Sequence, residues 1–156
     1  MSKIKLGFAL CGSFCTLSKA VDQMEKLANL NYDIIPIMSF NAYNLDRKFG
    51  KANDFIKKIE EISGKKILNS LTDVEPIGPK NMTDIMLVCP CTGNTLGKLC
   101  RASTDTPVTL AVKSHLRVQK PVVISFASND ALGGSAQNLG KAFNMKYFYF
   151  VPMSQD

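Results

Sequence analysis

Continuous apolar stretches alternate along the chain with segments whose apolar residues recur at helical spacing. The apolar stretches span residues 3–11, 33–38, 84–89, 121–127 and 147–151. Each is as long as a strand that is buried on both faces of a parallel sheet. The helical pattern covers residues 15–30, 51–63, 92–101, 106–118 and 132–143. Because strand and helix alternate without a hairpin signal, we expect an α/β fold with a three-layer, doubly wound, mainly parallel sheet.

Particular residues indicate where some of these elements begin or end and where one strand lies in the sheet. Pro36 lies inside the second strand and indicates an edge position, because proline cannot donate to a neighbouring strand. Gly64 is placed to end the helix over residues 51–63, and Asp105 or Thr106 to begin the helix over 106–118. Residues 65–80 follow no clear period, and we expect a short strand or turn followed by a loop.

The length and hydropathy of the chain limit the number of domains and the cellular location that we expect. The chain has 156 residues, enough for one α/β domain, so we predict a single domain over residues 1–156. The apolar runs are shorter than the roughly 20 residues that a membrane span needs. Gly12 and Ser13 interrupt the first apolar run before it reaches the length of a secretory signal. We therefore expect a cytoplasmic protein without a membrane partner.

The net charge of +6 does not by itself indicate a nucleic-acid-binding protein. Basic residues are scattered along the chain, and acidic residues such as Glu60 and Glu61 lie beside several of them. A nucleic-acid interface would gather the bases on one face and place aromatic residues among them. We expect a solvated basic surface that attracts small anions, and no nucleic-acid partner.

The five cysteines indicate reduced thiols, because an odd number in a cytoplasmic chain does not form a disulfide framework. Cys11 and Cys15, like Cys89 and Cys91, lack the spacing of a zinc site, and His115 lies elsewhere in the sequence. Although each pair follows a predicted strand, small buried side chains explain the cysteines better than a metal site. We predict no metal.

Small and hydrogen-bonding residues collect where the predicted strands end. In an open parallel sheet, ligands bind outside the carboxyl ends of the strands. The residues that we predict for this site are Gly12, Ser13, Phe14, Ser39, Pro90, Cys91, Thr92, Asn94, Thr95, Ser128 and Asn129. The alternative is that they only cap helices and form turns. A ligand site explains better why four strand ends share this character.

The residues that follow the first predicted strand indicate the type of ligand. A GxGxxG fingerprint is absent there, and no acidic residue ends the second strand, so the sequence does not predict a nicotinamide site. The Gly12-Ser13-Phe14 turn suits a mononucleotide phosphate such as that of FMN. His115 repeats with apolar residues on its helix and is expected to be structural, which leaves the catalytic residues unassigned.

Residues 89–106, CPCTGNTLGKLCRASTDT, resemble the P-x-S-x-N-T signature of the flavin-containing cysteine decarboxylase (flavoprotein) superfamily. Gly12-Ser13, Ser39 with Ala42, and Ser128-Asn129 also match positions of that superfamily. The strings IGPKNMTDI, PCTGNTL, TDTPVTLAVKSHLR and YFVP carry a closer likeness, to the family of dipicolinate synthase B subunits.

The resemblance implies a flavodoxin-like, Rossmann-like fold with an FMN pocket between the chains of a homo-oligomer. Gly12, Ser13, Phe14 and Ser39 would hold phosphate and ribityl chain, while residues 91–95 would face the flavin. It further implies that the chain forms dipicolinate during sporulation from dihydrodipicolinate, a small dicarboxylate. The separate A subunit of dipicolinate synthase would supply NAD(P). Chains of this family usually continue beyond the VP motif, so the resemblance also implies a missing carboxyl-terminal segment.

At two places the sequence differs from the pattern of the superfamily, and both differences bear on which reaction we expect. The decarboxylases carry a catalytic histidine between the second and third long strands, and no histidine lies between Ser39 and Asp84. Their P-x-M-N turn reads Phe-Ala-Ser-Asn here, over residues 126–129. An independent flavin-dependent decarboxylase is therefore disfavoured. The remaining alternative is a scaffold protein that binds FMN or phosphate without doing chemistry.

Overall fold

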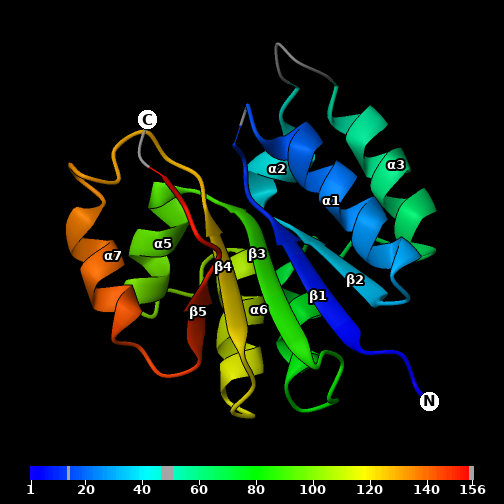
Figure 1. The fold of residues 1–156 in the computed structure, drawn as a ribbon. Helices are drawn as coiled ribbons and strands as arrows, with labels where there is room; N and C mark the ends of the chain where they lie inside the picture. The colour runs from blue at the N-terminus through cyan, green and yellow to red at the C-terminus, as the bar shows by residue number, and fades with distance from the viewer. Residues whose placement is uncertain (14, 47–50, 155–156) are drawn as a thin grey trace.

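The computed structural model describes residues 1–13, 15–46 and 51–154 and contains one sheet of five parallel strands (Figure 1). The strands are β1 (Lys5–Leu10), β2 (Asp33–Met38), β3 (Ile85–Cys91), β4 (Val122–Phe126) and β5 (Phe148–Phe150). Their order in the sheet is β2-β1-β3-β4-β5. The chain thus winds outwards in both directions from β1 and β3, which confirms the doubly wound α/β prediction.

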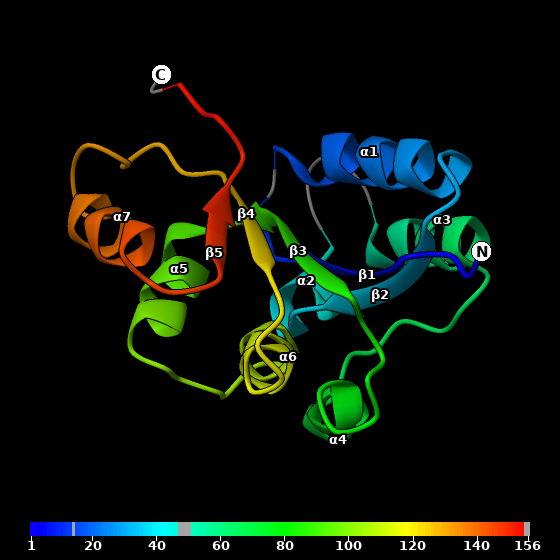
Figure 2. The same cartoon turned by 60° about the horizontal axis from the view of Figure 1, so that its bottom comes forward.

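Helices cover both faces of the sheet. The helices are α1 (Leu17–Asn29), α2 (Phe40–Asn44), α3 (Ala52–Ser63), α4 (Leu71–Val74), α5 (Gly93–Cys100), α6 (Pro107–Leu116) and α7 (Ala136–Phe143), with a short 3₁₀ helix η1 (Glu75–Ile77). Figure 2 shows α1 on one side of the sheet and α4 and α6 on the other. The three-layer prediction is confirmed.

Successive side chains along a strand point to opposite faces of the sheet, so a separate hydrophobic core forms on each face. Leu6, Phe8 and Leu10 of β1 pack into a cluster with buried residues of α1 and α3. Ala9 of β1 points to the opposite face, where it joins residues of β3, β4, α5 and α6, among them Val88. The central strands are buried on both faces, which is why they read as continuous apolar runs.

Local signals in the sequence correctly predicted several boundaries. Pro36 lies on β2, an edge strand of the sheet, as its missing N–H requires. Gly64 ends α3 in the left-handed conformation, at φ 67°. Thr106 is the N-cap of α6, and Pro107 occupies its first position.

The predictions were wrong where long-range contacts decide the structure. We placed Pro90 and Cys91 in a loop, but β3 runs through them, across a cis Cys89–Pro90 bond. The Pro90 carbonyl accepts from Cys11 N–H at 3.2 Å, and the Cys91 carbonyl accepts from Ala127 N–H at 2.8 Å. Pairing with the strands on either side therefore holds this segment extended.

Three short elements were missed, and the start of one helix was misplaced. The polar stretch after Ser39 contains α2, and the region predicted as a short strand or turn followed by a loop contains α4 and η1. Ser70 caps α4 and exchanges hydrogen bonds with Asp73 in a capping box, a local signal that we overlooked. Helix α7 begins at Ala136 instead of residue 132, because Gly133 and Gly134 favour turns.

Candidate functional site

A polar cavity opens at the carboxyl ends of the strands, between the residues that follow β1 and those that follow β3. It has a volume of about 420 Å³. Its lining consists of Gly12, Ser39, Phe40, Asn41, Thr92, Asn94, Thr95, Lys98, Asp105 and Thr106. This is the point at which the direction of winding reverses, where doubly wound proteins with this strand order bind FMN and other ligands. We call it the switch-point cavity.

The first wall of the cavity joins the end of β1 to α2. Ser39 follows β2, is buried, and caps α2 by accepting from Ala42 N–H at 3.2 Å. Gly12 lies against this helix, because a Cβ placed on Gly12 would come within 3.3 Å of the Asn41 Cβ. A side chain larger than hydrogen would therefore press on α2, and the backbone at Gly12 stays open to a ligand.

The second wall is the first turn of α5. The Thr92 hydroxyl accepts from Thr95 N–H at 3.2 Å and donates to the Thr95 hydroxyl at 3.1 Å. Both threonines are thus engaged in capping the helix. Asn94 is exposed, and among the described residues none forms a hydrogen bond with its amide. Its amide is therefore available to a ligand as donor and acceptor.

One cation lies in the lining, held by a carboxylate. Lys98 Nζ lies 3.0 Å from Asp105 Oδ1 and 2.9 Å from Oδ2. The hydrogen bond from Lys98 lowers the pKa of Asp105 below its ordinary value. The Lys98 side chain is 21% exposed and that of Asp105 is 65% exposed, so the ammonium is the more enclosed partner. The pair itself is electrically neutral, so an anionic ligand must compete with Asp105 for the Lys98 ammonium.

The structure places the other predicted site residues away from this cavity or outside the described ranges. The described residues that were predicted for the site but do not line the cavity are Ser13, Pro90, Cys91, Ser128 and Asn129. Phe14 lies outside the described residues. Pro90 and Cys91 are buried within β3, because their neighbours in the sheet cover them.

The serine turn after β4 packs against α5 from another side. Ser128 donates to Asp130, and a Cβ on Gly93 would come within 3.5 Å of the Ser128 hydroxyl. Ser13 accepts from the Thr16 hydroxyl at 2.5 Å in the turn before α1. In these two turns, the hydroxyls bond neighbouring residues of their own loop.

Sequence reasoning did not predict five of the lining residues for the site, namely Phe40, Asn41, Lys98, Asp105 and Thr106. Asp105 and Thr106 were considered as the start of a helix. Lys98 reads as an ordinary surface lysine of an amphipathic helix. Its only sequence signal is the acidic residue seven positions later, which the loop after α5 brings back to it.

The thiols near the cavity are protonated at neutral pH. Burial raises the pKa of Cys11 to about 11, although the hydroxyl of Thr95 opposes the shift. Burial also raises the pKa of Cys91 well above its ordinary value. Because a thiol is a nucleophile only when ionised, these residues are unsuited to covalent catalysis. In the described part of the chain, no three His, Cys, Asp or Glu side chains are arranged so that they could hold a metal ion.

His115 lies at the opposite end of the sheet from the cavity. It is fully buried, with Nε2 2.8 Å from the Pro121 carbonyl and Nδ1 2.8 Å from the Thr83 hydroxyl. A carbonyl only accepts, so Nε2 carries the proton and the neutral ring accepts from Thr83 at Nδ1. The complete burial of His115 agrees with the structural interpretation of this residue.

Comparison with known proteins agrees with this geometry. The model of the family described as Flavoprotein matches residues 1–146. The chain belongs to the Flavoprotein family. The B subunit of dipicolinate synthase from Bacillus subtilis (strain 168) is 38% identical, over 100% of this chain and 80% of that protein. These matches confirm the resemblance that the sequence strings indicated.

Solved structures place this Flavoprotein chain in the same fold. The crystal structure of the dipicolinate synthase B subunit from Bacillus halodurans C superposes with a TM-score of 0.85, at 38% identity, over 97% of this chain and 79% of that one. DmrB of Burkholderia xenovorans in complex with FMN gives a TM-score of 0.74 at 17% identity, over 97% and 89% of the two chains. The flavodoxin-like fold is confirmed. In the part of the chain that the structure describes, no helix combines the length and apolar character needed to cross a membrane.

Proposed function

We propose that this chain is the B subunit of a dipicolinate synthase, which forms dipicolinate from dihydrodipicolinate during sporulation together with an NAD(P)-binding A subunit. The observation that carries the proposal is the 38% identity to a dipicolinate synthase B subunit over the whole chain. The switch-point cavity supports it, because its hydroxyls, amides and Lys98 suit a small dicarboxylate. Residues 1–156 would act as one flavoprotein-like domain.

The same residues fit FMN. Gly12 lets the backbone approach a phosphate, the Asn94 amide is open to a ligand, and Lys98 offers a charge-assisted hydrogen bond. Phe40, 40% exposed at the rim, provides an apolar surface for a ring. Bound FMN would supply a hydride acceptor at this position. Asn94 and Lys98 would then orient the ligand's polar groups.

The cavity offers few groups that could remove a proton. Asp105 is the one carboxylate among the described lining residues, and its lowered pKa makes it a weak base at neutral pH. The single histidine is buried elsewhere. We infer that this chain binds and orients the substrate, while the A subunit supplies NAD(P)+ and the remaining catalytic groups. Among the two alternatives, this lack of a base in the cavity favours a scaffold protein and disfavours a decarboxylase.

We also propose that the chain forms a homo-oligomer. Phe40 stands exposed beside the cavity, where a neighbouring copy could complete a ring-binding site. The structurally similar DmrB is described as a cubic protein cage for redox transfer. A pocket shared between copies would place the apolar half of the ligand against the second chain.

Dipicolinate formation by the two proteins, separately and mixed, tests the proposed function. We expect the mixture, but neither of its components, to convert dihydrodipicolinate with NAD(P)+, as followed by the ultraviolet absorbance of dipicolinate. Each site would be incomplete by itself, because this chain lacks a nicotinamide fingerprint and its partner would lack the switch-point cavity. Full activity of the isolated A subunit would support the scaffold alternative, and activity of this chain in isolation would refute the division of labour.

Replacing Asn94 tests whether the cavity binds the flavin. Asn94→Ala should weaken FMN binding by about 1–3 kcal/mol, because a polar group of the ligand loses its partner. The measurement is quenching of flavin fluorescence on titration with protein. Asn53→Ala, an exposed asparagine on α3, is the matched control and should bind FMN as the wild type does. A lower melting temperature with unchanged affinity would show that Asn94 only supports the helix.

A further inference from the structure

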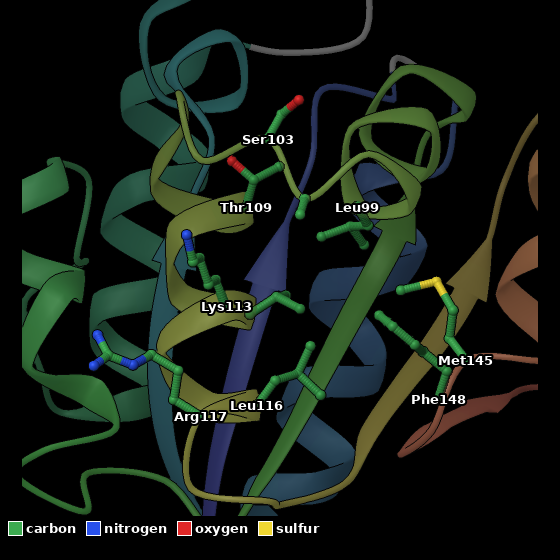
Figure 3. Close-up of a pocket in the computed structure, with 10 residues that line it drawn as sticks. Leu99, Ser103, Thr109, Lys113, Leu116, Arg117, Met145 and Phe148 are labelled. Atoms are coloured by element: carbon green, nitrogen blue, oxygen red, sulfur yellow. The ribbon is translucent and has the colours of Figure 1, made fainter.

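A second, apolar pocket lies between α5, α6 and β5. It has a volume of about 250 Å³. Its floor consists of Leu99, Val112, Leu116, Met145 and Phe148, and we call it the α6–β5 groove. Figure 3 shows Leu99, Leu116, Met145 and Phe148 turned towards the space between α6 and β5. The groove shares none of its described lining residues with the switch-point cavity.

Two cations on α6 border this groove. Lys113 and Arg117 lie one turn apart, and both are exposed. Figure 3 shows their charged ends on the side of α6 that faces away from the apolar floor. Among the described residues neither forms an ion pair, whereas Lys98 and Lys120 on the same half of the molecule do. Their stems line the groove and their charges remain available to a partner.

The size of the groove fits side chains of a partner protein. An apolar cavity of about 150 Å³ holds one benzene molecule, and drug-sized ligands need roughly 300 Å³ or more. At about 250 Å³, the groove lies between these limits and matches one or two large apolar side chains. Interfaces commonly place such an anchor in a pocket and surround it with polar contacts.

The two cations beside the α6–β5 groove indicate which kind of partner protein could bind there. Two exposed cations beside an apolar pocket favour an incoming segment that carries carboxylates next to its apolar anchor. A second copy of this chain is assigned to the face around Phe40 in the homo-oligomer proposed above, which leaves this groove to a different partner. A different and acidic protein surface is the better complement.

We propose that the α6–β5 groove is the docking site for the A subunit, which would insert an apolar side chain flanked by carboxylates. The choice of this partner rests on the proposed function. The groove lies on the face of the sheet that α6 covers, so docking there leaves the switch-point cavity open at the strand ends.

The test compares the affinity of the A subunit for variants of the full chain. The double variant Lys113→Glu/Arg117→Glu should weaken binding by at least about 10-fold in 0.1 M salt, and its affinity should depend less on salt than that of the wild type. The control Lys19→Glu/Lys26→Glu reverses two exposed charges on α1, on the opposite face, and should stay within about twofold of the wild type. Leu116→Gln removes an apolar contact without changing charge and should also weaken binding about 10-fold. Calorimetry gives the affinity, and thermal melts confirm that each variant is folded.

The outcomes separate this proposal from the proposed function. When the A subunit is saturating, both groove variants should form dipicolinate at the wild-type rate, because none of the substituted residues lines the cavity. Wild-type affinity in the folded groove variants would overturn the docking proposal and leave the function intact. A wild-type mixture that binds but forms no dipicolinate would overturn the function alone. A change in the homo-oligomer by light scattering, with unchanged affinity for the A subunit, would assign the groove to contacts between copies and refute docking.

Discussion

Lys98→Met is expected to weaken the binding of an anionic ligand to the switch-point cavity by about 1.5–3 kcal/mol, or roughly 10- to 150-fold. Lys98 is the one cation among the described residues that line the cavity. A charge-assisted hydrogen bond to a phosphate or carboxylate is worth more than a neutral one, and methionine keeps the apolar stem while removing the charge. Titrations with FMN and with dipicolinate measure the loss for each anion.

Asp105→Asn should act in the opposite direction. Asp105 now holds the Lys98 ammonium through both carboxylate oxygens, so an incoming anion competes with it. The ion pair is partly exposed and therefore weak, so removing it should tighten binding by no more than about fivefold. Lys113→Met serves as the charge-matched control for Lys98→Met, because Lys113 lines the α6–β5 groove and not the cavity. Equal affinity in Lys98→Met and wild type would show that the ammonium takes no part in anion binding.

His115→Leu is expected to destabilise the protein by about 1–3 kcal/mol and to lower the melting temperature by roughly 2–12 °C. The substitution leaves the Thr83 hydroxyl buried without its partner, while the Pro121 carbonyl loses one hydrogen bond and still accepts from Met86 N–H at 3.1 Å. Activity in the mixture with the A subunit, measured at a temperature at which the variant is folded, should equal that of the wild type, because His115 is far from the strand carboxyl ends. A variant that is fully folded but inactive would show that His115 takes part in the reaction.

The same residue predicts how stability depends on pH. Burial lowers the pKa of His115 below its ordinary value of 6.5, so the unfolded chain binds a proton that the folded chain does not. Its contribution to stability is present above pH 6.5 and is lost as the pH falls towards the lowered pKa. The melting temperature of the wild type should therefore fall between pH 7 and pH 5, and His115→Leu should show a flatter profile. Three described carboxyl groups have a lowered pKa, namely Glu60, Asp105 and Asp130. They lose their contributions only near and below 4.5 for Glu60 and 3.8 for the two aspartates, outside this window.

Part of the candidate site was predictable because the end of a strand can be recognised from a few neighbouring residues in the sequence. Gly12, Ser39 and Thr92 each follow an apolar run, and parallel strands bring such positions to one edge of a sheet. The same rule also selected Ser128 and Asn129, which follow β4 but do not line the cavity. Sequence order shows that a residue follows a strand but not how the strands are ordered in the sheet. The cavity forms between β1 and β3, and β4 lies one strand farther out.

The sequence alone determined the alternation of strands and helices, their approximate limits and the absence of a histidine from the region between Ser39 and Asp84. These properties depend on side-chain size, apolar period and capping, which act within a few residues. Only the tertiary structure decided that Lys98 meets Asp105, that β3 continues through Cys91, and that α6 and β5 leave an apolar groove between them. Each of these depends on groups that are distant in the sequence or lie across a loop, and packing alone decides which of them come into contact.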